Sequence, residues 1–305
     1  MRDTFLTKHL APRSGRSISR GWRPGALTWA ITLCALLGLG AGIYPMTAAW
    51  ISSYNQSQVL QNSSRPQHLA LTPTQQLAQA HAYNEALIAG VKLEADGTVP
   101  VSTGTVQGHS LRYADMLRAD NDGLMARIKI PAIDVDLPIF HGTSPETLLR
   151  GAGHLEGSHL PVGGSGTRSV ITAHRGLASA TMFTNLDRVK KGDSFTVETL
   201  GEALVYRVTD ISVIDPEDTG TLTAVPGKDL VTLITCTPLG INSQRILVTG
   251  ERITPTPPEA VRSVGMMSDL PGFPWWIVLA TLGLSLAAVY VWRRGYVDSS
   301  VHVRR

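Results

Sequence analysis

Two long runs of uncharged residues near the ends of the chain restrict most strongly what it can fold into. The first, Ala26–Trp50, reads ALTWAITLCALLGLGAGIYPMTAAW, and the second, Trp275–Trp292, reads WWIVLATLGLSLAAVYVW. An α-helix needs about 17–25 mostly apolar residues to cross the hydrocarbon core of a bilayer, and both runs meet that requirement. The sequence therefore predicts transmembrane helices at 26–50 and 275–292, with a folded region between them.

The first run is also compatible with a signal peptide. Cleaved signal peptides carry a shorter apolar stretch of roughly 7–15 residues, followed by small residues. Thr47-Ala48-Ala49 fits such a cleavage site, but the run before it is long. We therefore favour a retained anchor and keep cleavage as the alternative.

Charge is distributed unevenly along the 305 residues. Residues 1–25 contain six basic residues and one acidic residue, and residues 293–305 contain four and one, whereas the whole chain has a net charge of only +3. Basic flanks mark the cytoplasmic side of membrane helices, so both tails are predicted to be cytoplasmic and residues 51–274 extracytoplasmic. The remainder is net acidic and lacks the basic surface that nucleic-acid binding requires, so no nucleic-acid partner is expected.

The region between the two apolar runs divides by composition. Residues 51–122 combine a polar stalk, a helix and a long loop that is a possible lid. Thr72, Pro73 and Gln75 form a helix-start pattern, and Gly90 is the predicted stop. Residues 123–254 form the main domain, and residues 255–274 are a Pro-rich linker back to the membrane.

Short runs rich in Val, Ile, Leu and Thr, separated by turn residues, predict that the main domain is built mainly of strands. A helix is expected at Pro145–Arg150, between Ser144 and Gly151, and a hairpin turn at Gly201-Glu202. Because strands dominate, the fold class is mainly β, a closed or nearly closed barrel with short helices. The predicted strands are Met125–Ile130, Val135–Ile139, Ser169–Thr172, Ser194–Leu200, Leu204–Ile214, Leu230–Thr235 and Arg245–Ile253.

Three residues whose side chains can take part in catalysis lie at the ends of predicted strands: His174, Cys236 and Arg245. The other cysteine, Cys34, lies in the first apolar run, so Cys236 has no intrachain disulfide partner in the exported part. A neighbouring cation or imidazole favours the thiolate, an imidazole can protonate a leaving amine, and a fixed cation can stabilise an oxyanion. Together they suit acyl transfer through a thioester, although a core cysteine, a strand-end histidine and a solvated arginine are the structural alternatives.

A metal site is the competing interpretation of the same residue types. His154, His159, His174 and Cys236 could supply ligands, but they do not have the CxxC or HExxH spacing typical of zinc sites. No metal or other cofactor is therefore expected.

Several motifs resemble those of sortases. Thr232–Cys236 reads TLITC, similar to the TLxTC signature of that family, Arg245 follows nine residues later, and His174 lies in TAHRG. Three longer blocks, Ile130–Gly164, His174–Asp193 and Thr235–Ile253, resemble class C sortases, the pilin polymerases.

The resemblance implies an eight-stranded sortase barrel that carries out transpeptidation. Cys236 would attack the Thr–Gly carbonyl of an LPxTG-type signal, His174 would protonate the departing amine, and Arg245 would stabilise the oxyanion. Thr235 would position substrate through its hydroxyl group. A lysine of a pilin subunit would then resolve the thioester. The partners implied are LPxTG-type pilins or surface proteins and the bilayer, with a peptidoglycan precursor as a further candidate.

One departure concerns the lid. Class C sortases commonly carry an Asp-Pro-aromatic motif before the barrel, and no such triplet occurs between Gly90 and Met125. Asp115 in the long loop is the acidic residue that we consider for a place near Cys236. The alternatives are a housekeeping sortase that anchors proteins to peptidoglycan, a different cell-wall cysteine transpeptidase, and a tethered β-domain without catalysis.

Overall fold

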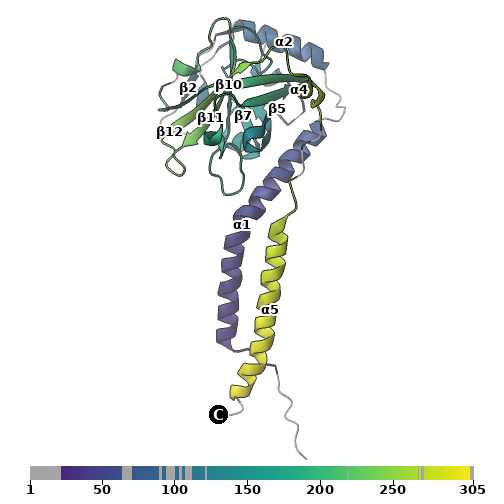
Figure 1. Cartoon of the computed structure of the whole chain (residues 1–305), viewed down its shortest axis with the longest axis vertical. Helices are drawn as coiled ribbons and strands as arrows, with labels where there is room; N and C mark the ends of the chain where they lie inside the picture. The colour runs from purple at the N-terminus through teal and green to yellow at the C-terminus, as the bar shows by residue number, and fades with distance from the viewer. Residues whose placement is uncertain are drawn as a thin grey trace, which may run out of the picture. The chain divides into compact units, whose positions relative to one another are not determined.

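The computed structural model describes residues 22–63, 71–88, 91–93, 100–102, 105–106, 112–120, 122–218, 220–266, 268 and 271–302 (Figure 1). The chain divides into two compact units. We call Met1–Tyr44 with Trp275–Arg305 the helix-pair unit, and Pro45–Pro274 the barrel unit. Most of the predicted basic tail at 1–25, several stretches of the predicted loop at 91–122, and residues 303–305 lie outside the described residues.

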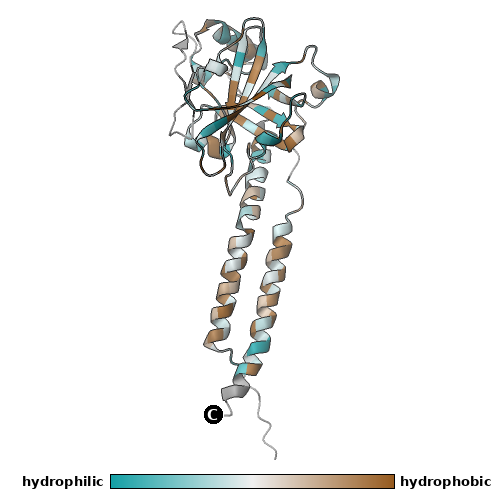
Figure 2. Ribbon diagram, turned by 60° about the vertical axis from the view of Figure 1, so that its left-hand side comes forward, coloured by the Kyte–Doolittle hydropathy of each residue, from teal (hydrophilic) through white to brown (hydrophobic). Residues whose placement is uncertain are grey.

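The helix-pair unit contains the first part of α1 (Ala26–Ser63) and α5 (Trp275–His302), which run in opposite directions. The carboxylate of Asp298 accepts hydrogen bonds from the Gly25 amide at 2.8 Å and the Thr28 hydroxyl at 2.7 Å. Hydrophobic residues dominate along both helices (Figure 2). Both are long and apolar enough to cross a membrane, which is compatible with the predicted membrane anchoring.

The N-terminal part of the barrel unit differs in detail from the prediction. Helix α1 continues to Ser63, so residues 51–63 of the stalk predicted at 51–70 are helical. Helix α2 (Pro73–Ala86) has the predicted capping box between Thr72 and Gln75. It ends before the predicted stop at Gly90, because the next two residues form a strand, β1 (Leu87–Ile88), which pairs with β4 (Thr105–Val106). A second two-stranded sheet, β2 (Val91–Leu93) with β3 (Pro100–Ser102), also falls in the segment predicted to be a loop.

Eight strands close into a barrel in the order β10-β12-β11-β8-β7-β6-β5-β9 (Figure 1). The mainly β, closed barrel expected from the sequence is confirmed, with the eight strands that the resemblance implies. Two neighbouring pairs, β6–β7 and β8–β11, are parallel, and the others are antiparallel. The strands are β5 (Leu124–Ile130), β6 (Val135–His141), β7 (Ala152–His154), β8 (Thr167–Thr172), β9 (Ser194–Thr199), β10 (Glu202–Ile214), β11 (Asp229–Thr237) and β12 (Gln244–Arg252).

Short helical elements join the strands. Helix α3 (Pro145–Arg150) has Ser144 as its N-cap, as predicted. The hairpin between β9 and β10 turns at Leu200-Gly201, one residue earlier than predicted, and both residues have positive φ, the conformation of tight two-residue turns. The remaining elements are the 3₁₀ helices η1 (Tyr113–Asp115), η2 (Pro131–Ile133), η3 (Leu186–Arg188) and η4 (Gly220–Leu222), and the helix α4 (Pro258–Arg262).

Side chains that alternate between the two faces of the sheet form two separate apolar clusters. The larger cluster fills the barrel and includes Val231 and Leu233 of β11, both at most 1% exposed. Because successive side chains of a strand point to opposite faces, the intervening Ile234 lies on the outer face. It packs there in a second cluster with Val170 of β8 and Leu247 of β12. The sheet is thus buried on both faces along β8, β11 and β12.

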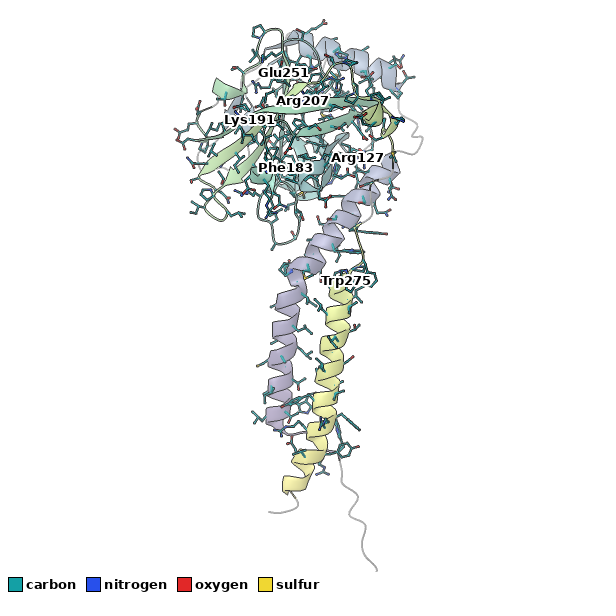
Figure 3. The ribbon with its side chains drawn as sticks, in the orientation of Figure 1. Arg127, Phe183, Lys191, Arg207, Glu251 and Trp275 are labelled. Carbon is teal, nitrogen blue, oxygen red and sulfur yellow. The ribbon has the colours of Figure 1, made fainter. Side chains whose placement is uncertain are left out.

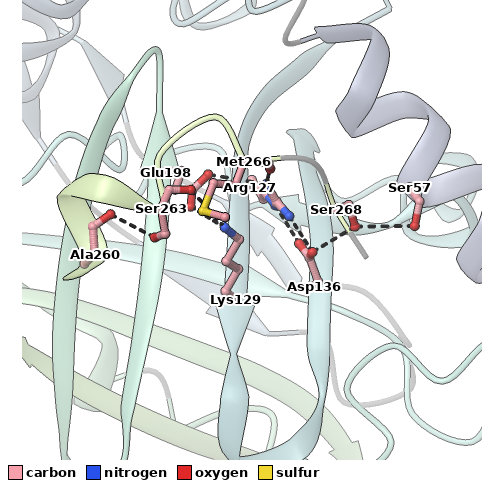
Figure 4. A network of polar contacts seen from close by, with 9 residues as sticks. All are labelled: Ser57, Arg127, Lys129, Asp136, Glu198, Ala260, Ser263, Met266 and Ser268. Atoms are coloured by element: carbon pink, nitrogen blue, oxygen red, sulfur yellow. Dashed lines mark hydrogen bonds and ion pairs between the residues drawn. The ribbon is translucent and has the colours of Figure 1, made fainter. Parts of the chain in front are cut away.

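The predicted linker at 255–274 contains α4 and packs against the barrel through polar groups (Figure 4). Arg127 of β5 binds both carboxylate oxygens of Asp136 and donates to the Met266 carbonyl oxygen at 2.7 Å. The Ser268 hydroxyl donates to Asp136 at 2.8 Å. The described part of this segment is therefore held on the barrel rather than extended away from it.

Candidate active site

Cys236 and Arg245 are paired across two neighbouring strands. In the antiparallel ladder of β11 and β12, the backbone positions of these two residues are direct partners. Directly opposite residues of such a ladder place their side chains on the same face of the sheet. Cys236 is 7% exposed and Arg245 is 1% exposed, so the thiol and the guanidinium are both sheltered from water.

His174 reaches the same row through the parallel pair β8–β11. Thr172 of β8 is level with Ile234 of β11, and the Ala173 amide donates to the Ile234 carbonyl oxygen at 3.2 Å. Continuing this register by two residues places His174 level with Cys236. Since parallel neighbours end at the same sheet edge, residues 62 positions apart in sequence come together there.

The row formed by His174, Cys236 and Arg245 lies on the outer face of the barrel wall. Cys236 is two residues from Ile234, which belongs to the outer apolar cluster, and therefore shares its face. The three predicted residues are thus brought to one edge of one face, by three strands that are adjacent in the sheet. This edge is the candidate active site.

Burial determines the protonation of the candidate residues. It raises the pKa of the Cys236 thiol, and the neighbouring Arg245 guanidinium partly opposes that effect. Burial also lowers the pKa of His174, which is half-buried. The net direction for the thiol is the reverse of the depressed pKa expected for an activated cysteine. At neutral pH the site favours a neutral thiol beside a neutral imidazole, so the thiol must lose its proton before it can attack a carbonyl group.

The Arg245 side chain is fixed by backbone carbonyl groups. Its Nη1 donates to the carbonyl oxygens of Asn242 at 2.8 Å and Gln244 at 3.0 Å, both in the connection before or at the start of β12. Asn242 has a positive φ of 60°, which turns the chain so that its carbonyl faces the guanidinium. A cation held in this way keeps a defined position beside Cys236, as oxyanion stabilisation requires.

Thr235 lies on the opposite face from Cys236. Its hydroxyl donates to the carbonyl oxygen of Ala173 at 2.8 Å, and the residue is 1% exposed. The contact described here is with the protein, and the role in substrate binding stays a prediction. The same bond joins the residue before Cys236 to the residue before His174.

His154 and Asp115 have partners other than the three candidate catalytic residues. His154 is fully buried, with its ring nitrogens facing the Tyr113 hydroxyl at 3.0 Å and the His159 carbonyl oxygen at 2.9 Å. Burial lowers the pKa of His154 to about 3. Asp115 forms a surface ion pair with Arg112 at 3.7 Å. Within the described ranges, no three His, Cys, Asp or Glu residues gather closely enough to hold a metal ion.

Sequence reasoning missed Arg175, the residue after His174. It lies within the TAHRG motif but received no role. The structure gives its guanidinium an acceptor beside Cys236, the Thr237 hydroxyl, at 2.8 Å. No local pattern reveals this contact, because the two residues are 62 positions apart.

Known proteins resemble this chain over its barrel. A sortase domain model matches residues 128–253. The chain is similar to the crystal structure of sortase C-1 from Actinomyces oris, with 48% identity and a TM-score of 0.52 over 59% of this chain and 97% of that one. It is also similar to the Group B Streptococcus Pilus Island 1 sortase C2, with 45% identity and a TM-score of 0.52. That match likewise covers 59% of this chain and 97% of the other.

Curated relatives are more distant. Sortase A from Streptococcus agalactiae is 31% identical over 123 residues, which cover 39% of this chain. The matched part spans about half, 49%, of that protein. Together with the barrel, the candidate site and the near-complete coverage of a class C structure, these matches show that the chain belongs to the sortase family of cysteine transpeptidases, with class C sortases as its structural neighbours.

Proposed function

We propose that this protein is a membrane-anchored class C sortase that joins pilin subunits covalently. The observation that carries the proposal is the row of His174, Cys236 and Arg245 at one strand edge, in a chain 45–48% identical to class C sortases. One of these neighbours is described as a pilus island sortase. The proposed substrates are LPxTG-type pilins or surface proteins, and no cofactor takes part.

The first half-reaction forms a thioester. The Cys236 thiol passes its proton to the His174 imidazole, and the resulting thiolate attacks the carbonyl carbon of Thr in the Thr–Gly bond. The oxyanion forms beside the Arg245 guanidinium. The C–N bond then breaks, and His174 supplies a proton to the departing glycine amine. Thr235 serves this step from the opposite face, by keeping the end of β11 against the end of β8.

The second half-reaction transfers the acyl group. The amine of a lysine on the next subunit attacks the thioester carbonyl, the C–S bond breaks, and the sulfur leaves as thiolate. The lysine loses a proton to the His174 imidazole. The imidazolium then passes this proton to the Cys236 thiolate, which restores the neutral thiol and the neutral imidazole. The net result is one amide bond lost and one isopeptide bond gained, without consumption of water.

The same proposal includes location. Residues 26–50 and 275–292 cross the membrane, both basic tails are cytoplasmic, and the barrel acts outside the cytoplasm. The apolar composition of α1 and α5 and the basic flanks of both runs support this arrangement. The lipid bilayer is then a permanent partner, and a peptidoglycan precursor is the acceptor in the housekeeping alternative.

An immunoblot of cell-wall extracts, boiled in SDS, tests the function. Host cells with the wild-type chain are expected to show a ladder of covalent pilin multiples, and cells with Cys236→Ala or His174→Ala only the monomer. Arg188→Lys, a charge-conserving change at an exposed position, is the matched control and should keep the ladder. Absence of a ladder in the wild type, with surface protein released into the medium by the Cys236→Ala strain, would favour the housekeeping sortase instead.

A further inference from the structure

Arg175 uses all three nitrogens of its guanidinium. Nε donates to the Thr184 carbonyl oxygen at 3.2 Å, Nη1 donates to the Thr237 hydroxyl at 2.8 Å, and Nη2 pairs with Asp187 at 2.7 Å. The side chain is 8% exposed. A planar guanidinium bound through all three nitrogens is held in one orientation, whereas a lysine ammonium on its flexible side chain is not.

These acceptors come from two parts of the chain, the strand that carries Cys236 and a segment that follows His174. Thr237 follows Cys236 directly on β11. Thr184 and Asp187 lie in the segment at 181–188. This segment reaches into the main core through Phe183, labelled in Figure 3, and Leu186, and both side chains are 0% exposed. Arg175 therefore connects the strand end that presents the thiol to a segment that the core holds in place.

The same segment also holds the backbone on either side of Arg175. The Phe183 amide donates to the His174 carbonyl oxygen at 3.0 Å, and the Gly176 amide donates to the Thr184 hydroxyl at 3.1 Å. Gly176 has a φ of 74°, and a Cβ atom there would overlap the side chain of Leu239 from the β11–β12 connection. The histidine-bearing turn is thus packed against the chain that follows Cys236.

We propose that Arg175 is a positioning residue that sets the distance between the His174 imidazole and the Cys236 thiol. This inference rests on the proposed function, because it assigns Arg175 to the proton transfer between those two groups. The guanidinium does not touch the substrate. It fixes the turn after β8 and the end of β11 to each other, at the residues that directly flank the two reacting side chains.

Of the contacts of Arg175, the hydrogen bond to Thr237 is the one that indicates a role in positioning the reacting groups rather than in stabilising the fold. Asp187 is 46% exposed, and an ion pair with so exposed a partner contributes little to folding. The Thr237 hydroxyl, by contrast, lies at the active-site end of β11, one residue after Cys236. A small displacement of one reacting group, on the order of 1 Å, is enough to slow a positioned reaction about 100-fold.

Peptide transfer by the full-length protein in detergent tests the proposal, with an LPxTG peptide and an amine acceptor. Arg175→Lys keeps the positive charge but loses the planar guanidinium with its several donors. Thr237→Val removes the hydroxyl that accepts from Arg175, and Thr237→Ser keeps that hydroxyl. We expect kcat to fall about 10–100-fold in the first two variants, with KM within about threefold of the wild-type value. Thr237→Ser should recover most of kcat, and Arg188→Lys should match the wild type.

Thiol alkylation gives a second measurement that does not depend on transfer. It is made in a Cys34→Ala background, so that Cys236 is the only thiol. Arg175→Lys and Thr237→Val should shift the pH profile of alkylation, and Thr237→Ser should leave it in place. Unchanged kcat and an unchanged profile in both variants would overturn the proposal. Absence of transfer by the wild type would overturn the proposed function instead, with the alkylation profile still testing whether Arg175 positions the thiol.

Discussion

The hydroxyl of Thr235 donates a 2.8 Å hydrogen bond to the carbonyl oxygen of Ala173, and thereby joins the two residues that precede Cys236 and His174. Both partners are almost fully buried, at 1% and 2% exposed. The bond crosses the parallel pair β8–β11 where regular strand pairing ends. It therefore extends the contact between the two strands up to the candidate active site.

Replacing Thr235 with valine tests this bond. The two side chains have nearly the same shape, but valine leaves the buried Ala173 carbonyl oxygen without this donor. We expect the free energy of unfolding to fall by about 1–3 kcal/mol, measured by chemical denaturation, together with slower peptide transfer. Thr235→Ser keeps the hydroxyl and should retain most of the transfer rate. Equal behaviour of the valine and serine variants would show that the hydroxyl has no such role.

Arg245→Lys tests whether charge alone suffices beside Cys236. Lysine keeps the cation but lacks the planar group that the Asn242 and Gln244 carbonyl oxygens hold in place. We expect kcat for peptide transfer to fall roughly 100-fold, the scale seen when an oxyanion donor is lost. Circular dichroism should still report a folded barrel. A lysine variant with full activity would indicate that long-range attraction, rather than a directed donor, stabilises the oxyanion.

The buried His154 makes stability depend on pH. Its pKa is lowered from 6.5 in the unfolded chain to about 3 in the folded protein, because burial disfavours the charged ring. The unfolded state therefore binds more protons below pH 6.5, and stability is lost as the pH falls from about 6.5 toward 3.

The expected slope for His154 is about 1.4 kcal/mol of unfolding free energy per pH unit within that window. Urea denaturation at several pH values measures it. His154→Gln, which keeps a hydrogen-bonding side chain without a titratable ring, should flatten the slope, and His81→Gln, at an exposed position, should not. A slope that is unchanged in the His154 variant would contradict the assignment.

The polar network beneath the linker gives a further prediction. Glu198 accepts from Lys129 at 2.6 Å and lies 3.6 Å from Arg127, and it is only 8% exposed. Glu198→Gln removes the buried negative charge between two cations, and should lower the free energy of unfolding by about 3 kcal/mol. The control is Asp210→Asn, which disrupts the exposed Lys191–Asp210 pair and should cost less than about 1 kcal/mol. Equal effects of the two changes would show that burial does not strengthen the network.

The parts of the fold that depend on neighbouring residues in the sequence were the most predictable. The capping box of α2 and the bounds of α3 follow from neighbouring residues, and both are confirmed. The strands β1 to β4 and β7 were missed because segments of two or three residues carry no periodicity. Helix α4 was missed because its surroundings are rich in proline, which marks loops but also suits a first helical turn.

The sequence predicted which three residues meet at the candidate site, but not the contacts that hold their strands together. His174, Cys236 and Arg245 lie at strand ends, where polar side chains meet, and their motifs are explicit in the sequence. The contacts of Arg175 are long-range, and its acceptors lie 9, 12 and 62 residues away. The direction of the Cys236 pKa also depends on burial, which the sequence does not show.

The parallel pairing of β8 with β11 has a consequence for how such enzymes diversify. Because the two strands are neighbours in the sheet, the spacing of His174 and Cys236 does not depend on the length of the chain that joins them. Insertions or grafted loops between β10 and β11 would reshape the surroundings of the thiol while the reacting pair stays in register. That connection is therefore the natural place to exchange segments between relatives in order to redirect recognition without rebuilding the catalytic chemistry.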